Sequence, residues 1–339
     1  MPSLLSLPLE NVQRPPPVNI VAADEMLFVH EYERQIAAME AKVLRNVRIL
    51  RNGYLVRAAR VLPDTFAVRP SAPRRVVVGF KALRDSILLS KSSTIQAGLF
   101  ITDEFSNGFF HWICDVLPRL EALCAGAREE LGTRTVLVPW MACFHYTGDT
   151  LKPYGDITVR YLREREQIPC SDLLVVPPVA PTGNYRPVLM RALRARFRDF
   201  FQSTAAGRRI FISRADAPKR RIDNEQDLVP VLERFGFETI ALENLSFAEQ
   251  VRLIGSAEVL AGSHGAGLAN MCWMEPGTKV LELRRRGDAE NNCYYSLASA
   301  LDLKYGYMQC DPVTSKSDSH AGDLHVDASE LERSCAMLF

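Results

Sequence analysis

In the second half of the chain, short apolar runs alternate with segments in which apolar residues recur at helical spacing. The apolar runs have the length of buried strands and lie at 209–213, 239–242, 257–261, 279–283 and 305–308. The segments with helical spacing lie at 224–235, 246–255, 268–274 and 290–301. Strands that alternate with helices require a parallel sheet covered on both faces. Residues 204–339 are therefore expected to form a doubly wound α/β domain, with 311–339 as a loop or docked tail.

The same alternation begins at residue 98 in the first half. Strands are expected at 99–102, 135–138, 157–161 and 173–176. A long helix is expected at 107–124, and an Arg-rich amphipathic helix at 186–201 closes a first domain of residues 98–203. Residues 1–97 are expected to pack on that domain as an extended arm, 1–20, and a small strand-rich portion. The strands of this portion are expected at 48–56, 75–78 and 86–89.

A glycine-rich turn joins a predicted strand to a predicted helix in the second domain. It reads Gly262-Ser263-His264-Gly265-Ala266-Gly267-Leu268-Ala269-Asn270. A helix N-terminus presents N–H groups without partners and the positive end of the helix dipole, which together suit a phosphate. Three glycines leave room for a large anion to touch the backbone. The alternative is a tight strand–helix turn with a helix-capping histidine.

Cations follow other strands of the same domain. In an open parallel sheet, ligands bind beyond the carboxyl ends of the strands. Ser213 and Arg214 follow the first strand, 219–221 is a Lys-Arg-Arg run, and 284–286 is an Arg run with Glu282 just before it. Cations that converge on a bare helix N-terminus suit a diphosphate, and Glu282 can accept from ribose hydroxyls. For the run 219–221 the alternative is a solvated surface loop.

The first domain carries one dense group of functional side chains. His111, Asp115 and Arg119 are spaced four residues apart and would share one face of the predicted helix. Charged groups on an otherwise apolar helix are costly unless they pair or face a cleft. Asp115 or His111 can therefore take a proton from a hydroxyl nucleophile. The alternative is a buried network that fixes the helix.

Composition narrows the possible partners. The chain has 339 residues, of which 47% are hydrophobic and 24% charged, with a net charge of +1. No overall field recruits nucleic acid or an acidic membrane, so any anion site must be local. The eight cysteines are scattered without a CxxC pair, which predicts reduced thiols in a cytoplasmic protein without a zinc site. No apolar stretch is long enough to span a membrane, and 1–9 lacks the features of a signal peptide.

Several common motifs are absent from the sequence. No Asp-x-Asp pair follows a strand of the first half, so no metal site is expected. The phosphate-binding loop of nucleotide hydrolases and the dinucleotide fingerprint are also missing. Ser263 and His264 are sequence neighbours whose side chains diverge, so they make a poor nucleophile–base pair.

Two segments resemble the signatures of glycosyltransferase family 61. The first is Asn107-Gly108-Phe109-Phe110-His111-Trp112 with Asp115-Val116-Leu117-Pro118-Arg119. The second comprises 212–214, 246–250, 262–270, 276–277 and 280–283. The resemblance covers roughly residues 98–310. It implies an α/β fold of two Rossmann-like doubly wound domains facing a cleft, the B-type glycosyltransferase architecture.

The resemblance also implies an activity: inverting, metal-independent transfer of a sugar from a nucleotide-diphosphate donor to a glycan or glycolipid acceptor. The lack of an anchor suggests a bacterial cytoplasmic enzyme of surface polysaccharide synthesis, acting at the inner face of the membrane. The donor, expected to be UDP-linked, is a substrate, and no cofactor is expected. The alternative is a non-catalytic partner that binds a nucleotide-sugar or glycan. Peripheral membrane association and a homo-oligomer are left open.

These inferences assign roles to individual residues. Asp115 and His111 are the candidate bases, with Asp115 favoured. The candidate donor-binding residues are Arg214, Ser213, Gly262, Ser263, His264, Gly265, Ala266, Gly267, Asn270 and Glu282. Further candidates are Asn107, Arg119 and Lys219.

Overall fold

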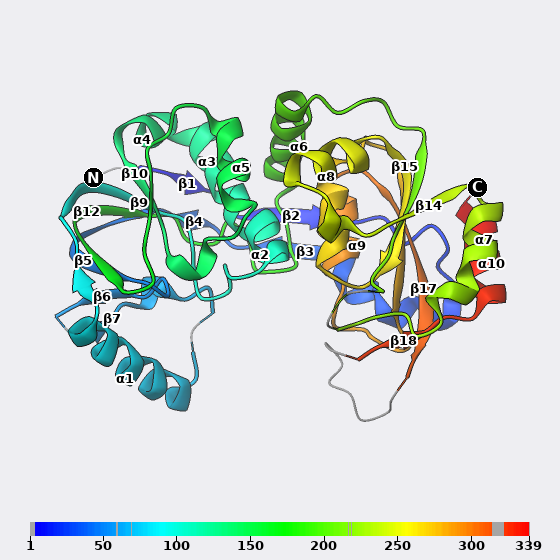
Figure 1. Cartoon of the computed structure of the whole chain (residues 1–339), viewed down its shortest axis with the longest axis horizontal. Helices are drawn as coiled ribbons and strands as arrows, with labels where there is room; N and C mark the ends of the chain where they lie inside the picture. Colours follow the sequence, from blue (N-terminus) through cyan, green and yellow to red (C-terminus); the bar gives the residue numbers. More distant parts are fainter. Residues whose placement is uncertain are drawn as a thin grey trace. The chain divides into compact units, whose positions relative to one another are not determined.

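The computed structural model describes residues 4–58, 60–68, 70–215, 217, 219–313 and 322–338. The chain forms two compact units (Figure 1). Unit 1 comprises Met1–Glu10 and Ile36–Thr182, and unit 2 comprises Asn11–Gln35 and Gly183–Phe339. These bounds differ from the expected division at 97/98 and 203/204, because residues 11–35 and the helix at 186–201 belong to unit 2.

Unit 2 is built on a six-stranded sheet in the order β14-β13-β15-β16-β17-β18. Its strands are β13 (Arg208–Ile212), β14 (Phe237–Ile240), β15 (Ala257–Ser263), β16 (Lys279–Arg285), β17 (Lys304–Pro312) and β18 (Leu324–His325). Neighbours from β14 to β17 pair in parallel, and the short β18 is antiparallel to β17. The parallel sheet predicted for this half is confirmed.

Helices cover both faces of this sheet. They are α6 (Pro187–Phe201), α7 (Glu225–Arg234), η7 (Leu242–Asn244), α8 (Phe247–Gly255), η8 (Ala266–Trp273), α9 (Cys293–Ala300) and α10 (Ala328–Leu338). α7 and α10 pack together on one face, whereas α6, α8 and η8 pack against one another, with the rings of Phe197 and Trp273 stacked 4.8 Å apart. Helix α8 begins at the predicted capping box of Ser246 and Glu249.

Residues 11–35 and the C-terminal segment complete unit 2. The short helices η1 (Ala22–Leu27) and η2 (Val29–Glu31) bring fully buried Phe28 against the rings of Tyr295 and Tyr305. The tail is a docked element, because α10 buries Leu331 and Cys335 in the core of this unit. The part of the predicted tail at 314–321 lies outside the described residues. Burial of apolar side chains therefore ties η1, η2 and α10 to unit 2.

Unit 1 contains an eight-stranded mixed sheet. Four parallel strands have the order β11-β10-β9-β12. They are β9 (Ile95–Phe100), β10 (Thr135–Val138), β11 (Val159–Tyr161) and β12 (Glu166–Val175). Beyond β12, β5 (Lys42–Leu50), β6 (Leu55–Arg57) and β7 (Arg60–Val61) continue the sheet with antiparallel pairing, and β8 (Ser90–Lys91) pairs with β12. The expected strand-rich portion is thus part of this sheet and not a separate layer, and the sheet is not purely parallel.

The strands expected at 75–78 and 86–89 are wrong, since helix α1 (Ala72–Leu88) contains the first and all but the last residue of the second. The β-branched run 76–78 favours a strand locally. However, Val78, Ala82 and Asp85 are buried at helical spacing, and Ala82 packs with Leu50 and Val56 of the sheet. Tertiary packing therefore decides the structure of this segment.

The remaining elements of the N-terminal half are short. The helices are η3 (Pro63–Thr65), α2 (Phe109–His111), η4 (Trp112–Val116), α3 (Leu117–Gly126), α4 (Arg128–Thr133), η5 (Trp140–Ala142), α5 (Thr147–Leu151) and η6 (Lys152–Tyr154). Two small sheets pair β1 (Ser6–Leu7) with β4 (Met39–Glu40) and β2 (Glu10–Gln13) with β3 (Glu33–Ile36). In the described ranges, no helix is both long and apolar enough to cross a membrane.

Candidate active site

The strand order of unit 2 identifies where a ligand is expected. Numbered along the chain from β13, the parallel strands have the order 2-1-3-4-5. In such sheets the ligand binds at the carboxyl ends of the first and third strands, where the strand order reverses. These strands are β13 and β15, and Ile212 of β13 pairs with Gly262 of β15. Arg214 and the glycine-rich turn therefore lie at the switch point.

Arg214 lies directly against Gly265. A Cβ atom added to Gly265 would lie 2.8 Å from Nη1 of Arg214, closer than such contacts allow. The backbone of Gly265 is extended, with φ of 176°, so a larger residue here would meet no backbone strain but would have to displace the Arg214 guanidinium. Arg214 donates from Nε to the carbonyl of Arg220 at 3.0 Å and from Nη2 to that of Lys219 at 2.7 Å. The predicted pairing of cation and turn is thus present in the structure.

The loop after β13 contributes cations of different kinds. Lys219 is exposed, and Arg221 pairs with Asp323 at 3.4 Å. Arg220 is half-buried, and its Nε atom is buried without a hydrogen-bond partner in the described part of the chain. Ser263 is buried and donates to the carbonyl of Arg220 at 3.3 Å, so its hydroxyl holds the loop.

Arg214 and Arg220 form a local concentration of positive charge. Burial lowers the pKa of Arg214, and the charge of Arg220 lowers it further. Among the described residues, neither guanidinium forms an ion pair with a carboxylate. A bound anion would relieve both the desolvation and the repulsion, so this pair suits a phosphate.

Glu225 fixes the entry to this loop. This residue in the first turn of α7 accepts from the hydroxyl of Ser213 and, at 3.1 Å, from the backbone N–H of Arg214. The Ser213 hydroxyl also accepts from the N–H of Ala215 at 3.3 Å. Ser213 is therefore a positioning residue rather than a direct ligand. An acidic residue in the first turn of a predicted helix, here Glu225, is favourable at that position and could have indicated this role from the sequence.

His264 is held by a buried carboxylate. Its Nδ1 atom hydrogen-bonds Glu282, which also accepts from the hydroxyl of Tyr305. Burial alone would raise the pKa of Glu282, but the charge and hydrogen bond of His264, together with Arg284, hold it below the ordinary value. With both oxygens occupied and no exposed surface, Glu282 does not fit the predicted ribose contact. It orients the His264 ring instead, leaving Nε2 without a hydrogen-bond partner among the described residues.

Tyr294 supports the turn from α9. Its hydroxyl donates to the carbonyl of Gly265 at 2.6 Å, and its ring lies 4.9 Å from that of His264. Tyr294 and Tyr305 were missed by the sequence analysis. No local signal points to them, because their partners are set by how strands and helices meet.

Three of the predicted donor ligands serve the packing of the turn. Added Cβ atoms on Gly262 and Gly267 would each lie 3.2 Å from the side chain of Ile212, so these glycines allow close packing on β13. Asn270 is buried, donates to the carbonyl of Gly267 at 3.1 Å and accepts from Trp273 at 3.0 Å. These contacts give the three residues a structural role, while the backbone N–H of Gly267 remains among the groups that begin η8.

The arginines at the end of β16 and just beyond it also differ from expectation. Arg284 is buried, donates to Asn292 at 3.0 Å and lies 4.9 Å from the ring centroid of Phe28. Arg286 pairs with Asp311 at 2.6 Å. The candidate anion site therefore consists of Arg214, Arg220, His264 and the N–H groups that begin η8, with Lys219 and Ala266 beside it.

In unit 1, His111 and Asp115 form the predicted pair. Nδ1 of His111 lies 2.7 Å from Oδ2 of Asp115, which also accepts from the hydroxyl of Thr182 at 3.1 Å. The His111 ring stacks on Phe105, with centroids 5.6 Å apart. The Asp115 side chain is 8% exposed, whereas that of His111 is 29% exposed. The imidazole is therefore the more accessible member of the pair.

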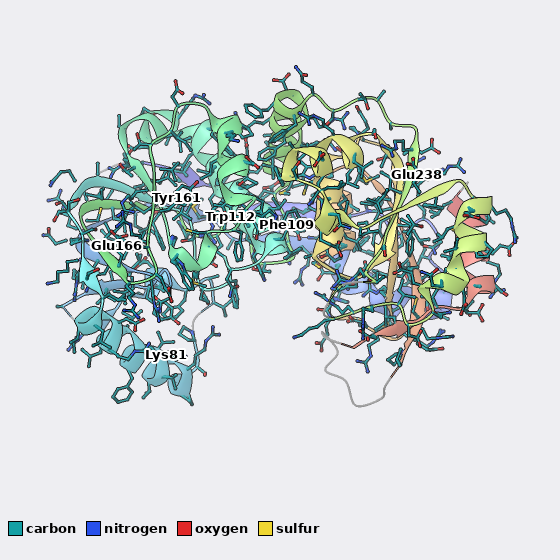
Figure 2. The ribbon with its side chains drawn as sticks, in the orientation of Figure 1. Lys81, Phe109, Trp112, Tyr161, Glu166 and Glu238 are labelled. Atoms are coloured by element: carbon teal, nitrogen blue, oxygen red, sulfur yellow. The ribbon has the colours of Figure 1, made fainter. Side chains whose placement is uncertain are left out.

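The helix carrying this pair is irregular. Phe109 and Trp112, labelled in Figure 2, flank His111 at the change from α2 to the π-helical turn η4. A long regular helix was predicted here, but the π-helical turn interrupts it and contains Asp115. Such turns occur often at functional sites.

Arg119 does not join this pair through its charge. Buried Arg119 forms an ion pair with Asp103 and donates to the backbone carbonyl of Asp115 at 3.1 Å. A cavity of about 220 Å³ is bordered by Arg119 and Asp103, at the carboxyl ends of β9 and β12. The predicted row of three charges therefore divides into two pairs. Asn107 is exposed, without a side-chain hydrogen bond in the described part.

The comparisons with known proteins identify the family of the chain. The sequence model of the family described as Glycosyltransferase 61 matches residues 109–281, about half of the chain. The chain belongs to glycosyltransferase family 61. The matched segment includes the His111–Asp115 pair, Arg214 and the glycine-rich turn. Among the described residues, no group of three or more potential ligands could hold a metal ion.

Two curated relatives are transferases from animals. An EGF domain-specific O-linked N-acetylglucosamine transferase of Drosophila melanogaster is 29% identical over 105 residues, 30% of this chain and 20% of that protein. A protein O-linked-mannose beta-1,4-N-acetylglucosaminyltransferase 2 of Xenopus tropicalis is 33% identical over 127 residues, 34% of this chain and 22% of that protein. The alignments thus span about a fifth of the length of each relative.

Proposed function

We propose that this chain is a glycosyltransferase that moves a sugar from a nucleoside-diphosphate donor to an acceptor hydroxyl. Family membership supports the reaction class. The observation that carries the assignment of the donor is the contact of Arg214 with Gly265 at the switch point of unit 2. Arg214 and the backbone of the glycine-rich turn bind the donor diphosphate, which is also the leaving group of the reaction.

Unit 2 stabilises the leaving group in this proposal. As the glycosidic bond to the donor breaks, negative charge grows on the terminal phosphate oxygen. Arg214, Arg220 and the first N–H groups of η8 are positioned to receive it without further reorganisation. Nε2 of His264, whose ring is fixed by Glu282, adds a further hydrogen-bonding atom. These groups provide positive charge without a metal ion, which supports metal-independent transfer.

Unit 1 supplies the base in this proposal. Nδ1–H of His111 donates to Asp115, so the neutral ring has its lone pair on Nε2. Nε2 removes the acceptor hydroxyl proton while the oxygen attacks the anomeric carbon and the diphosphate departs. A single displacement inverts the anomeric configuration. The difference in exposure favours His111 as the base and Asp115 as its orienting partner, which reverses the preference drawn from the sequence.

The relatives suggest a first choice of substrate. Both are named as N-acetylglucosamine transferases, so we propose a UDP-linked sugar, with UDP-N-acetylglucosamine as the first candidate. We further propose a glycan acceptor in bacterial surface polysaccharide synthesis at the cytoplasmic face, and the B-type arrangement of two Rossmann-like domains.

A nucleotide-sugar screen tests the proposal. Because a ligand that binds only the folded state raises the melting temperature, thermal shifts across UDP, GDP and CMP sugars identify the donor. Mass spectrometry of acceptor glycans incubated with that donor then detects transfer. A shift with UDP-sugars and a product with inverted configuration support the proposal. Tight donor binding without transfer or hydrolysis supports the non-catalytic alternative, and the absence of any shift contradicts the donor site.

A further inference from the structure

Helix α1 presents a second apolar face to solvent. Its buried face carries Val78 and Ala82, which pack on the sheet of unit 1. A different set of apolar residues, spaced along one stripe of the helix, is exposed: Val76 (58%), Phe80 (70%), Leu83 (42%) and Ile87 (73%). Their spacing of four, three and four residues places them on one face over three turns. A contiguous group of large exposed apolar side chains indicates an interaction surface, whereas single exposed apolar residues are common on any protein.

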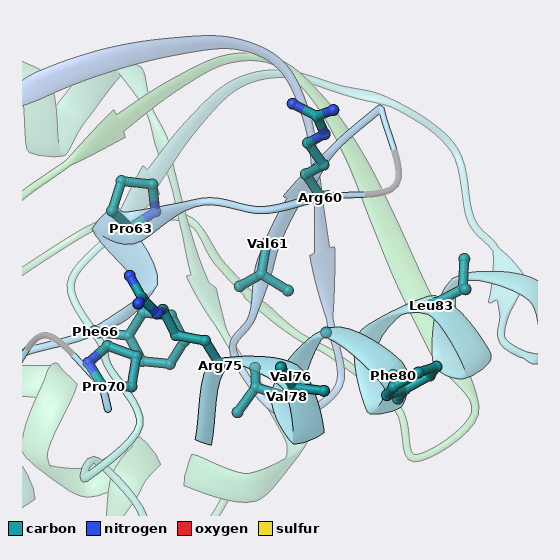
Figure 3. Close-up of a pocket in the computed structure, with 11 residues that line it drawn as sticks. Arg60, Val61, Pro63, Phe66, Pro70, Arg75, Val76, Val78, Phe80 and Leu83 are labelled. Atoms are coloured by element: carbon teal, nitrogen blue, oxygen red, sulfur yellow. The ribbon is translucent and has the colours of Figure 1, made fainter. Parts of the chain in front are cut away.

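The apolar surface extends beyond the helix. A groove of about 770 Å³ lies between α1, β7 and η3. Figure 3 shows its lining side chains, among them Val61 of β7, Pro63 of η3 and Val76 of α1. Arg60 and Arg75 also line this groove. It therefore combines an apolar lining with two guanidinium groups.

Basic residues flank the exposed stripe. Arg74, Arg75, Lys81 and Arg84 are all exposed on α1, and Lys81 is labelled in Figure 2. The helix has one acidic residue, Asp85, which is buried and pairs with Arg84 at 2.7 Å. The whole chain carries a net charge of only +1, so this helix is strongly basic against a neutral background. The exposed surface thus offers apolar side chains between cations.

We propose that α1 lies on the surface of a lipid bilayer with anionic headgroups. Phe80, Leu83 and Ile87 enter the boundary between headgroups and acyl chains, while Lys81 and Arg75 contact lipid phosphates. A helix with a basic flank and an apolar stripe binds such a bilayer through burial of the apolar side chains and through attraction of the basic ones to anionic headgroups. One face remains packed on the sheet, so the helix lies in the interface and does not span the bilayer. This role is independent of the transferase activity.

Charge argues for a bilayer over a second copy of the chain. A twofold dimer through this stripe would place the same surface of α1 on both sides of the interface. Four exposed basic residues of one copy would then face the same four of the other. An anionic bilayer instead neutralises all of them. Such a partner satisfies the apolar and the charged parts of the surface together, which a second copy does not.

Flotation of the full chain with lipid vesicles tests the proposal. Vesicles of phosphatidylcholine alone are compared with vesicles that also contain phosphatidylglycerol. We expect binding to the anionic vesicles, weakened by added salt, and at least about tenfold weaker binding to the neutral ones. Phe80→Ser and Ile87→Ser should each weaken binding about tenfold or more. Arg75→Gln and Lys81→Gln should each weaken it about fivefold.

Matched controls separate binding from folding. All four substituted side chains are exposed, so the melting temperature should stay close to that of the unchanged protein. Val188→Ser, at a residue of α6 that is 69% exposed, should leave vesicle binding unchanged. Equal binding to neutral and anionic vesicles, or full binding by the α1 variants, would overturn the proposal. So would a chain that ignores vesicles and forms a dimer that Phe80→Ser dissociates.

Discussion

Arg214 and Gly265 make the contact on which the donor site depends, and each can be altered separately. Arg214→Ala removes a charged hydrogen-bonding group from the diphosphate. We expect a loss of about 1.5–3 kcal/mol in UDP affinity, roughly 10- to 150-fold, measured by calorimetry. Arg208→Ala is the matched control, because this exposed arginine lies at the opposite end of the same strand and pairs with Glu238, labelled in Figure 2. Unchanged UDP affinity in a folded Arg214→Ala would place the donor elsewhere.

Gly265→Val tests the close approach itself. The extended backbone at Gly265 accepts a valine, but its Cβ would displace the guanidinium of Arg214. We expect donor affinity to fall about as far as in Arg214→Ala, with little change in melting temperature. Gly207→Val is the control, since no atom lies within 4 Å of an added Cβ at that position. Global unfolding of Gly265→Val would instead identify a purely structural turn.

The His111–Asp115 pair can be tested by two nearly isosteric changes. If His111 is the base, His111→Gln should lower turnover about 10²- to 10⁴-fold while donor affinity stays constant. Asp115→Asn should also lower turnover and shift its pH profile, because the ring loses its orienting partner. His325→Gln changes another histidine–aspartate pair, formed with Asp223 at 2.9 Å, and should leave turnover unchanged. Normal turnover in His111→Gln with loss in Asp115→Asn would make Asp115 the base.

At the scale of elements, helix α10 shows how the tail contributes to unit 2. Leu331 is fully buried in the core formed with α7 and the sheet. Leu331→Ala should lower the free energy of unfolding by about 2–5 kcal/mol, measured by denaturant titration. Met337→Ala in the same helix is the control, because Met337 is 61% exposed. Equal stability of both variants would show that α10 is not part of the cooperative core.

Helices and strands whose apolar residues recur with a clear period were predicted best. In unit 2 the apolar runs gave all five parallel strands, and β10 of unit 1 matches its prediction at both ends. The strand prediction within 72–88 failed because three successive valines favour a strand locally. Burial of every third or fourth residue instead stabilises a helix. The π-helical turn after His111 has no signature in the apolar pattern, since its extra residue per turn is decided by packing.

For the whole molecule, the proposed metal independence rests on the positive charge of the candidate anion site. Arg214, Arg220 and backbone N–H groups can carry the leaving-group charge. Turnover should therefore be the same in EDTA as with Mg²⁺ or Mn²⁺, in an assay of sugar transfer from the identified donor. Loss of activity in EDTA that Mn²⁺ restores would contradict both this mechanism and the proposed charge stabilisation.

The sequence by itself determined the parallel sheet of unit 2, the place of the glycine-rich turn and the candidate pair of His111 and Asp115. These follow from local periods and from chemistry that neighbouring residues carry. It also indicated the family, through motifs that overlap the matched segment 109–281.

Only the tertiary structure decided which of these residues are accessible. It buried Glu282 beneath His264 and packed Asn270 and two glycines against their neighbours. It also left Nε of Arg220 without a hydrogen-bond partner among the described residues. It also assigned residues 11–35 to unit 2 and exposed a second face on α1. These outcomes depend on which strands become neighbours and which faces are covered. Such contacts join residues far apart in the chain, so no local pattern encodes them.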